Sequence, residues 1–538
     1  MLEKILKFSI RQRLLIIITT LTIAVLGVYN FQRLPIDAVP DITNIQVQIN
    51  TEATGYSPLE VEQWITFPVE TAMAGLPSLE KARSISRYGL SQVTVIFHEG
   101  TNIYFARQLI NERIQGVKGK LPPGIEPTMG PIATGLGEIF MWSVDAEPGA
   151  LKEDNTPYTS SDLRTIQDWT IRPQLINIPG IADVNTIGGY SKQFHVTPDP
   201  DKLIAYGVTF RDVLESLAKN NANVGAGYIE HNGEQYLIRS PGQVTNMEEI
   251  GQITIGNHAG TPIYIRDVAS VSLGKELRTG AATMNSKEVV LGTVFMLMGE
   301  NSRTVSQRVA AKMEEVNKTL PRGVTAKTVY DRTDLVNATI KTVRNNLLEG
   351  AVLVITILFL FLGNIRAALL TALIIPLSML FTVTGMVSNK VSGNLLSLGA
   401  IDFGIIVDGA VIIVENCIRR MGEEQHRLGR IMKKEERLEI VFESSNEVLR
   451  PSIFGVFIIM VVYLPILSLT GIEGKMFFPM AFTVITALLS AMVLSITFLP
   501  AAIALFLSHR ISEKENFIIK LVRKAYIPSL NIAMQNRL

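Results

Sequence analysis

Residues Leu395–Asn416, LLSLGAIDFGIIVDGAVIIVEN, decide the fold of this chain, because they place two aspartates inside an apolar run long enough to cross a bilayer. An aspartate near the centre of a membrane helix opposes insertion by about 2.5 to 3.5 kcal/mol. Hydrocarbon disfavours the charged carboxylate, and proton binding offsets that cost. Asp402 and Asp408 are therefore candidate proton carriers, and the stretch predicts an ion-coupled membrane protein.

Five further apolar runs have membrane-spanning length. One lies near the N-terminus, and the others share the second half of the chain with the run at Leu395–Val414. They are Leu14–Tyr29, Leu347–Leu362, Ala367–Val387, Ser452–Leu469 and Phe477–Leu507. We therefore expect an α-helical membrane bundle of one plus five transmembrane helices, with residues 1–32 holding the first helix and residues 340–508 the other five.

The basic residues orient this bundle. Four lysines and arginines lie in residues 4–13, before the first run, and seven lie between Arg419 and Arg437, after the fourth. Both segments are expected in the cytoplasm, which places the polar interval of residues 31–346 outside it. Residues 31–34, Phe-Gln-Arg-Leu, offer no small-residue cleavage site, so we expect a retained anchor rather than a signal peptide.

The composition excludes several other classes of protein. The 538 residues are 47% hydrophobic and 18% charged, with a net charge of +1, which predicts several domains and gives no sign of a nucleic-acid partner. A single cysteine, Cys417, permits no disulfide framework. We find no nucleophile beside a base and no phosphate loop, so we expect a transporter rather than an enzyme.

The long polar interval repeats an α+β pattern. A first unit, residues 33–131, shows β-α-β-β-α periodicity over Ile45–Val117, and a similar pattern restarts at Glu138. We expect two ferredoxin-like βαβ subdomains outside the cytoplasm, the second split into residues 132–180 and 276–335 around a β-rich insertion at 181–275. Strands are expected at Ala182–Ile187 and Gln193–Val196. Residues 509–538 are expected to form a cytoplasmic amphipathic segment.

Two motifs and this layout together resemble the resistance-nodulation-division superfamily, in its heavy-metal-efflux branch. The motifs are IDFGIIVDGAVIIVEN in the fourth span and RLPIDAVPDI after the first. DFGIIVDGAVIIVEN is similar to the cobalt/zinc/cadmium type of permease and differs from the copper/silver type, which lacks the first aspartate and the glycine after the second. The resemblance implies a proton/metal antiporter of a Gram-negative inner membrane. In such a protein the two α+β subdomains would lie in the periplasm, and the insertion at 181–275 would be a docking insertion. The resemblance also implies a homotrimer working with a periplasmic adaptor and an outer-membrane channel, with no cofactor beyond the transported ions.

Helical geometry separates the acids of the fourth span. Asp408 and Glu415 are seven residues apart, which puts them within about 20° of one face and roughly 10 Å apart along the axis. Asp402 lies about 120° around the helix from Asp408 and faces a different neighbour. We predict that these three acids form a proton relay, and that Gly404 and Gly409 admit a second helix beside them. The alternative is that the acids make fixed polar contacts or, for Glu415, face solvent.

A complete permease of this family resembles two tandem copies of the present layout, with twelve spans. In that family the basic partner of the fourth-span aspartate comes from the second copy, and here no other span has a lysine or arginine in its interior. We therefore hypothesise that the chain is the N-terminal half of a split or truncated permease and needs a C-terminal half. A multidrug permease and a non-transporting remnant remain as alternatives. Gly409 directly after Asp408 and the 7% aromatic content argue against the drug permease.

Two periplasmic acids resemble the metal-binding positions of zinc-type relatives. They are Glu138 in GLGEIFMW and Asp168 in TIQDWTIRP. Their oxygen ligands suit a divalent cation. The alternatives are that both are solvated surface acids and that Met296 and Met298 carry a softer ion, although methionine on an apolar strand is more often part of a core. The histidines show no ligand spacing.

Overall fold

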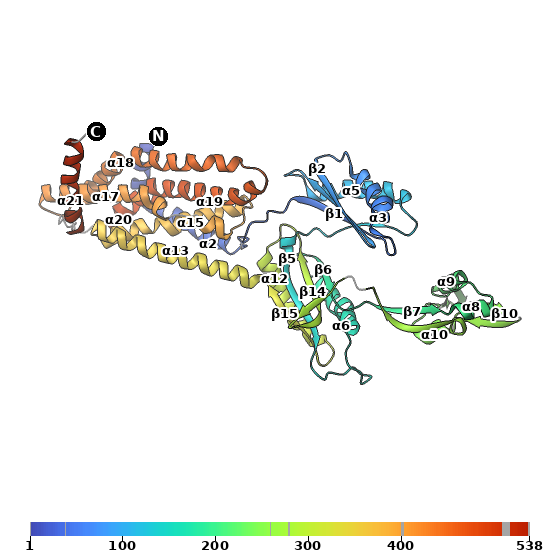
Figure 1. Cartoon of the computed structure of the whole chain (residues 1–538). Helices are drawn as coiled ribbons and strands as arrows, with labels where there is room; N and C mark the ends of the chain where they lie inside the picture. The colour runs from blue at the N-terminus through green and yellow to red at the C-terminus, as the bar shows by residue number, and fades with distance from the viewer. Residues whose placement is uncertain are drawn as a thin grey trace. The chain divides into compact units, whose positions relative to one another are not determined.

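The computed structural model describes residues 2–37, 39–240, 242–258, 260–277, 280–399, 403–507 and 517–535. These residues form two compact units. The first unit contains Met1–Ile139, Met296–Arg308 and Asp331–Leu538, and the second contains Phe140–Phe295 and Val309–Tyr330. Figure 1 labels many of the helices and strands of both units.

Six helical segments of the described chain are long and apolar enough to cross a membrane, which confirms the expected bundle of one plus five. Several begin earlier than their apolar runs. The second span, for example, starts at Arg332 rather than at Leu347, because its polar first turns continue the same helix α13. The segments are α2 (Arg13–Phe31), α13 (Arg332–Leu362), α14 (Ile365–Ala372) with α15 (Ile374–Ser388), α16 (Leu395–Gly399) with α17 (Phe403–Leu428), α18 (Lys434–Tyr463), and α19 (Gly471–Ile496).

Two short helices complete the packing of this bundle. Helix α1 (Leu2–Arg11) buries Leu6 and Ile10, and α20 (Phe498–Phe506) is buried along nearly its whole length. Small residues permit close helix contacts: a Cβ at Gly27 of α2 would lie only 2.6 Å from the Cβ of Leu380 on α15. The amphipathic stretch near the C-terminus is helical as α21 (Phe517–Gln535).

The first α+β subdomain is a four-stranded antiparallel sheet with helices packed on one face (Figure 1). Its strand order, β2-β3-β1-β4, is the ferredoxin-like order. Strand alternation turns Val47, Ile49 and Val93 inward against Ile110 of the second helix. The elements are β1 (Ile45–Glu52), α3 (Pro58–Val61), α4 (Phe67–Met73), β2 (Leu79–Arg87), β3 (Leu90–Phe97), α5 (Ile103–Val117) and β4 (Pro127–Met129).

The second subdomain repeats this topology. Strand β14 lies beside β5 and pairs with β6, and β15 lies on the other side of β5, so the order β6-β14-β5-β15 matches that of the first sheet. Trp142 on β5 is fully buried, and Gly292 on β14 leaves room for its indole, because a Cβ there would lie 2.3 Å from the ring. The elements are β5 (Glu138–Ala146), α6 (Ser160–Ile166), α7 (Arg172–Leu175), β6 (Ile181–Ile187), β13 (Ala282–Met284), β14 (Lys287–Met296), α12 (Ser302–Thr319) and β15 (Val324–Asp331).

The pairing of β6 with β14 corrects the expected limits of the insertion. Residues 181–187 belong to the second sheet, so the insertion begins after Ile187 rather than at residue 181. The expected strand Gln193–Val196 is part of β7 (Lys192–Pro198), which pairs with β12 (Ala269–Lys275) and not with that sheet. Within its described residues the insertion also contains two hairpins and four short helices. These are β8 (Val224–His231) with β9 (Glu234–Ser240), β10 (Thr254–His258) with β11 (Thr261–Tyr264), α8 (Pro200–Tyr206), α9 (Phe210–Lys219), α10 (Met247–Gly251) and α11 (Ile265–Val268).

Both subdomains widen their first helix at the same place. A π-helical turn spans Glu62–Thr66 in the first and Gln167–Ile171 in the second. Pro68 and Pro173 follow within two residues of each turn. Proline has no N–H to donate to the carbonyl four residues earlier, and a wide turn accommodates that loss without ending the helix. The second of these turns carries Asp168.

Candidate functional site

Helix α17 presents two different faces along its membrane part. One face is buried against the rest of the bundle and includes Ile406, Ala410 and Ile413. The other is exposed in this chain, and the exposed residues Gly404, Asp408, Ile412 and Glu415 follow one another at intervals of four, four and three. That spacing forms a single stripe on a helix. We call these four residues the open stripe.

Asp408 and Glu415 therefore share one face, as their spacing predicts. Within the described part of the chain neither carboxylate has an ion-pair or hydrogen-bond partner. The third predicted acid, Asp402, lies outside the described residues. The loop that follows the helix is basic and expected in the cytoplasm, so Glu415 lies nearer the cytoplasmic end than Asp408 does.

Gly409 makes the close helix contact that its small size predicts, on the buried face. The Ser452 hydroxyl of α18 donates to the Gly409 carbonyl oxygen at 3.2 Å. A Cβ at position 409 would lie 2.9 Å from the Ser452 Oγ. The neighbouring helix at Gly409 is therefore α18, and it packs on the side of α17 away from the open stripe.

Asn416 is a polar anchor of the buried face that sequence reasoning missed. Its Nδ2 donates to the Ser444 carbonyl oxygen at 2.8 Å and to the Glu447 carboxylate at 3.2 Å, both on α18. Its Oδ1 accepts from Arg419 at 2.7 Å. The side chain is 8% exposed, so these bonds fix the register between α17 and α18 near their cytoplasmic ends. The only sequence signal was its place beside Glu415.

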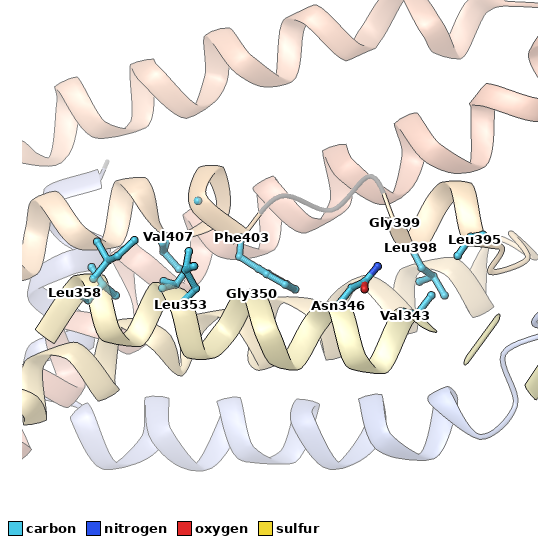
Figure 2. Close-up of a pocket in the computed structure, with 13 residues that line it drawn as sticks. Val343, Asn346, Gly350, Leu353, Leu358, Leu395, Leu398, Gly399, Phe403 and Val407 are labelled. Carbon is cyan, nitrogen blue, oxygen red and sulfur yellow. The ribbon is translucent and has the colours of Figure 1, made fainter. Parts of the chain in front are cut away.

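An apolar cavity of about 600 Å³ lies beside the start of α17, between this helix, α13 and α16 (Figure 2). Gly404 of the open stripe lines it together with Phe403 and Val407. Among the described residues of its lining, Asn346 of α13 is the one polar side chain, and the others are aliphatic residues, Phe403 and glycines. These described residues include no carboxylate, histidine or cysteine that could bind a metal cation.

The two predicted metal residues lie in different units. Glu138 is the half-buried first residue of β5, directly after a short 3-10 turn at Gly135–Gly137. Asp168 is half-buried in the π-helical turn, and both of its carboxylate oxygens are engaged: Oδ2 accepts from Arg164 at 2.6 Å and Oδ1 from the Thr186 hydroxyl at 2.6 Å. Among the described residues no three histidine, cysteine or acidic side chains form a metal-binding group.

Comparisons with known proteins find similar sequences along the whole of this chain. The family model described as the AcrB/AcrD/AcrF family matches residues 5–538. Protein HelA of Legionella pneumophila is 68% identical over 98% of this chain and 50% of its own length. The cobalt-zinc-cadmium resistance protein CzcA of Cupriavidus metallidurans is 61% identical over 100% of this chain and 50% of its own.

A solved structure is similar over the same extent. The crystal structure of a heavy metal efflux pump, in its crystal form II, superposes with a TM-score of 0.82 at 34% identity, covering 92% of this chain and 48% of that one. The chain spans about half the length of the relatives it matches, and it corresponds to the N-terminal half of the CzcA proteins.

Proposed function

Since the chain belongs to the AcrB/AcrD/AcrF family of resistance-nodulation-division transporters, we propose that it is the N-terminal half of a proton-coupled exporter of divalent heavy-metal cations. The family is one of transporters and not of enzymes. The observation that carries the proposal is the open stripe, because two acids face outward from a helix whose other face is packed in the bundle.

The open stripe is the surface that a C-terminal half would cover. Carboxylates at membrane depth are stable only when they are protonated, paired or hydrated. A helix of the second half that brings a basic residue to Asp408 would supply the pairing. Proton binding to Asp408 would cancel that attraction, so the two helices would separate and approach again as the proton arrives and leaves.

Glu415 extends this path toward the cytoplasm. It lies on the same face, two helical turns further along α17 and roughly 10 Å away. A proton released from Asp408 would reach it through the water admitted when the two halves separate. Asp402 would complete the predicted relay on a neighbouring face.

We assign metal binding to Glu138 and Asp168 on the grounds of ligand chemistry. Carboxylate oxygens suit divalent ions, and the remaining ligands would come from the second half. Asp168 is held by Arg164 and Thr186, so binding through it would require Arg164 to release one oxygen. Cobalt, zinc and cadmium appear in the name of one close relative, and we propose ions of this kind here. The resting assembly would be a homotrimer in the inner membrane, joined to a periplasmic adaptor and an outer-membrane channel.

The test is metal tolerance in a metal-sensitive Gram-negative host that carries this chain with and without a matching C-terminal half. Zinc, cobalt or cadmium tolerance that needs both halves, and that disappears in Asp408→Asn, supports the proposal. Ile412→Ala, a change on the same stripe that leaves both acids in place, is the matched control and should keep tolerance. Absence of tolerance in every combination contradicts the proposal, and export of an organic dye in its place would indicate a multidrug permease.

A further inference from the structure

The motif RLPIDAVPDI has no part in the function proposed so far, yet its residues 34–37 are held by backbone hydrogen bonds and by buried apolar contacts. After α2 ends, the chain runs along the linker between α15 and α16. The amide of Asp37 donates to the Gly393 carbonyl oxygen at 3.0 Å, and the Gly393 amide donates to the Pro35 carbonyl oxygen at 2.8 Å. Leu34 and Ile36 are buried in the same apolar cluster as Val336 of α13. The exit of the first membrane helix is thus held against α13 and against the linker between α15 and α16.

An ion pair between the partly exposed Asp37 and the buried Arg332 joins this segment to the first residue of α13. The Arg332 side chain is 8% exposed, and its Nη2 and Nε lie 2.8 and 3.1 Å from Oδ1 of Asp37. Two donors on one carboxylate oxygen fix the direction of the guanidinium. Loss of either partner would remove this charge-assisted contact beside a nearly buried guanidinium, which makes the pair sensitive to substitution.

The residue before Arg332 is tied in a different direction. Asp331 caps α13 by accepting from the Thr333 amide at 2.7 Å, and the same oxygen accepts from the Ser306 hydroxyl at 2.7 Å. Ser306 is fully buried on α12, and its Oγ also lies 3.2 Å from the carbonyl oxygen of Ile139, the residue after Glu138. One hydroxyl proton serves these two acceptors, so Ser306 joins the start of α13 to the strand that begins with Glu138.

Helix α13 then reaches the helix that carries the acids. A Cβ at Gly350 would lie 2.8 Å from the Phe403 ring of α17, and Figure 2 shows both residues at the wall of the apolar cavity. All of these residues belong to the first unit. A continuous set of contacts therefore runs from Ile139 through Ser306, Asp331 and α13 to Phe403. The ion pair between Asp37 and Arg332 lies at the start of α13, within this set.

We propose that Asp37, Arg332, Asp331 and Ser306 are positioning residues that form one joint at the start of α13, through which metal binding near Glu138 changes the position of α13 against the acid-bearing helix α17. This inference rests on the proposed function. In this joint, the motif RLPIDAVPDI holds Arg332 through Asp37 and is itself held by the linker between α15 and α16. No residue of the joint binds metal or carries the transported proton.

The first arm of the test separates coupling from binding. Vesicles contain this chain with its C-terminal half, and zinc-driven proton movement and zinc affinity are both measured. Asp37→Asn, Arg332→Gln and Ser306→Ala should each lower zinc-driven proton movement about tenfold while zinc affinity stays within about twofold. The reciprocal exchange Asp37→Arg with Arg332→Asp should recover most of the loss. Lys312→Gln, which breaks an exposed ion pair with Glu315 on α12, is the matched control and should change neither.

The second arm does not depend on transport. Hydrogen exchange is followed in the membrane-embedded chain, and Asp37→Asn should speed exchange about fivefold in residues 302–308 and 138–146 as well as in residues 331–336. Faster exchange in residues 331–336 alone would mean a local ion pair and would overturn the joint. Equal loss of zinc affinity and proton movement would also overturn it. If the unaltered protein moves no protons in response to zinc, the proposed function fails, and the exchange pattern still decides whether the joint exists.

Discussion

The two faces of α17 differ in the contacts that their residues make with the rest of the chain. The buried face is specified by packing: Gly409 lies against Ser452, and Asn416 is bonded to α18. The open stripe has no such contacts at Asp408 and Glu415 in the described chain, although it carries the most costly residues of the span. The comparison teaches that one side of the helix builds this half of the bundle, while the two acids lie on the side that this half leaves exposed.

The largest effect is expected on the open stripe, at Asp408. Asp408→Asn keeps the size of the side chain and removes its ability to exchange a proton. In a host that expresses both halves, we expect metal tolerance to fall to the level of the host without the exporter, while the amount of protein in the membrane is unchanged. Growth across a zinc gradient and quantification of the membrane protein measure the two quantities. Retained tolerance would mean that the open stripe is not the proton path.

The next effect tests the buried face, at Gly409. Gly409→Val places a side chain where a Cβ already lies 2.9 Å from the Ser452 Oγ, and overpacking of this kind costs about 1 to 3 kcal/mol. We expect a lower unfolding temperature and less protein in the membrane for this chain even without a partner half. Gly404→Val, on the open stripe, is the matched control, and it should leave the stability of the single half unchanged. An equal loss for both variants would remove the distinction between the faces.

A smaller effect is expected for the buried anchor Asn416. In Asn416→Ala, the Glu447 carboxylate keeps its bond from Arg420 and Arg419 keeps Glu423, so few groups are left without partners. We expect a loss of about 1 kcal/mol in unfolding free energy, the usual net worth of a hydrogen bond. Chemical denaturation of the detergent-solubilised chain measures it. A loss above about 3 kcal/mol would show that the amide holds the whole contact between α17 and α18.

The same contrast explains how much was predictable from sequence. The spans and the shared face of Asp408 and Glu415 follow from local periodicity, which depends on residues within a few turns. The place of β6 in the second sheet does not, because its partner β14 follows about a hundred residues later, after the insertion. The contacts of Asn416 were equally hidden, since Ser444 and Glu447 lie on another helix. Pairing between distant segments leaves no local pattern to read.

Of the two acids in the open stripe, Glu415 should have the smaller effect on transport, and this sharpens the comparison within the open stripe itself. Glu415 lies nearer the cytoplasmic end than Asp408, where water can replace a lost carboxylate as the next proton acceptor. Glu415→Gln should therefore slow transport by roughly threefold to tenfold, equivalent to about 0.7 to 1.4 kcal/mol in the barrier, rather than abolish it. Initial rates of zinc-driven proton movement in vesicles measure the change. If Glu415→Gln slows transport as much as Asp408→Asn does, the two acids act as one unit and are equally necessary for transport. If it has no effect, the proton path leaves α17 above Glu415, and the open stripe ends functionally at Ile412.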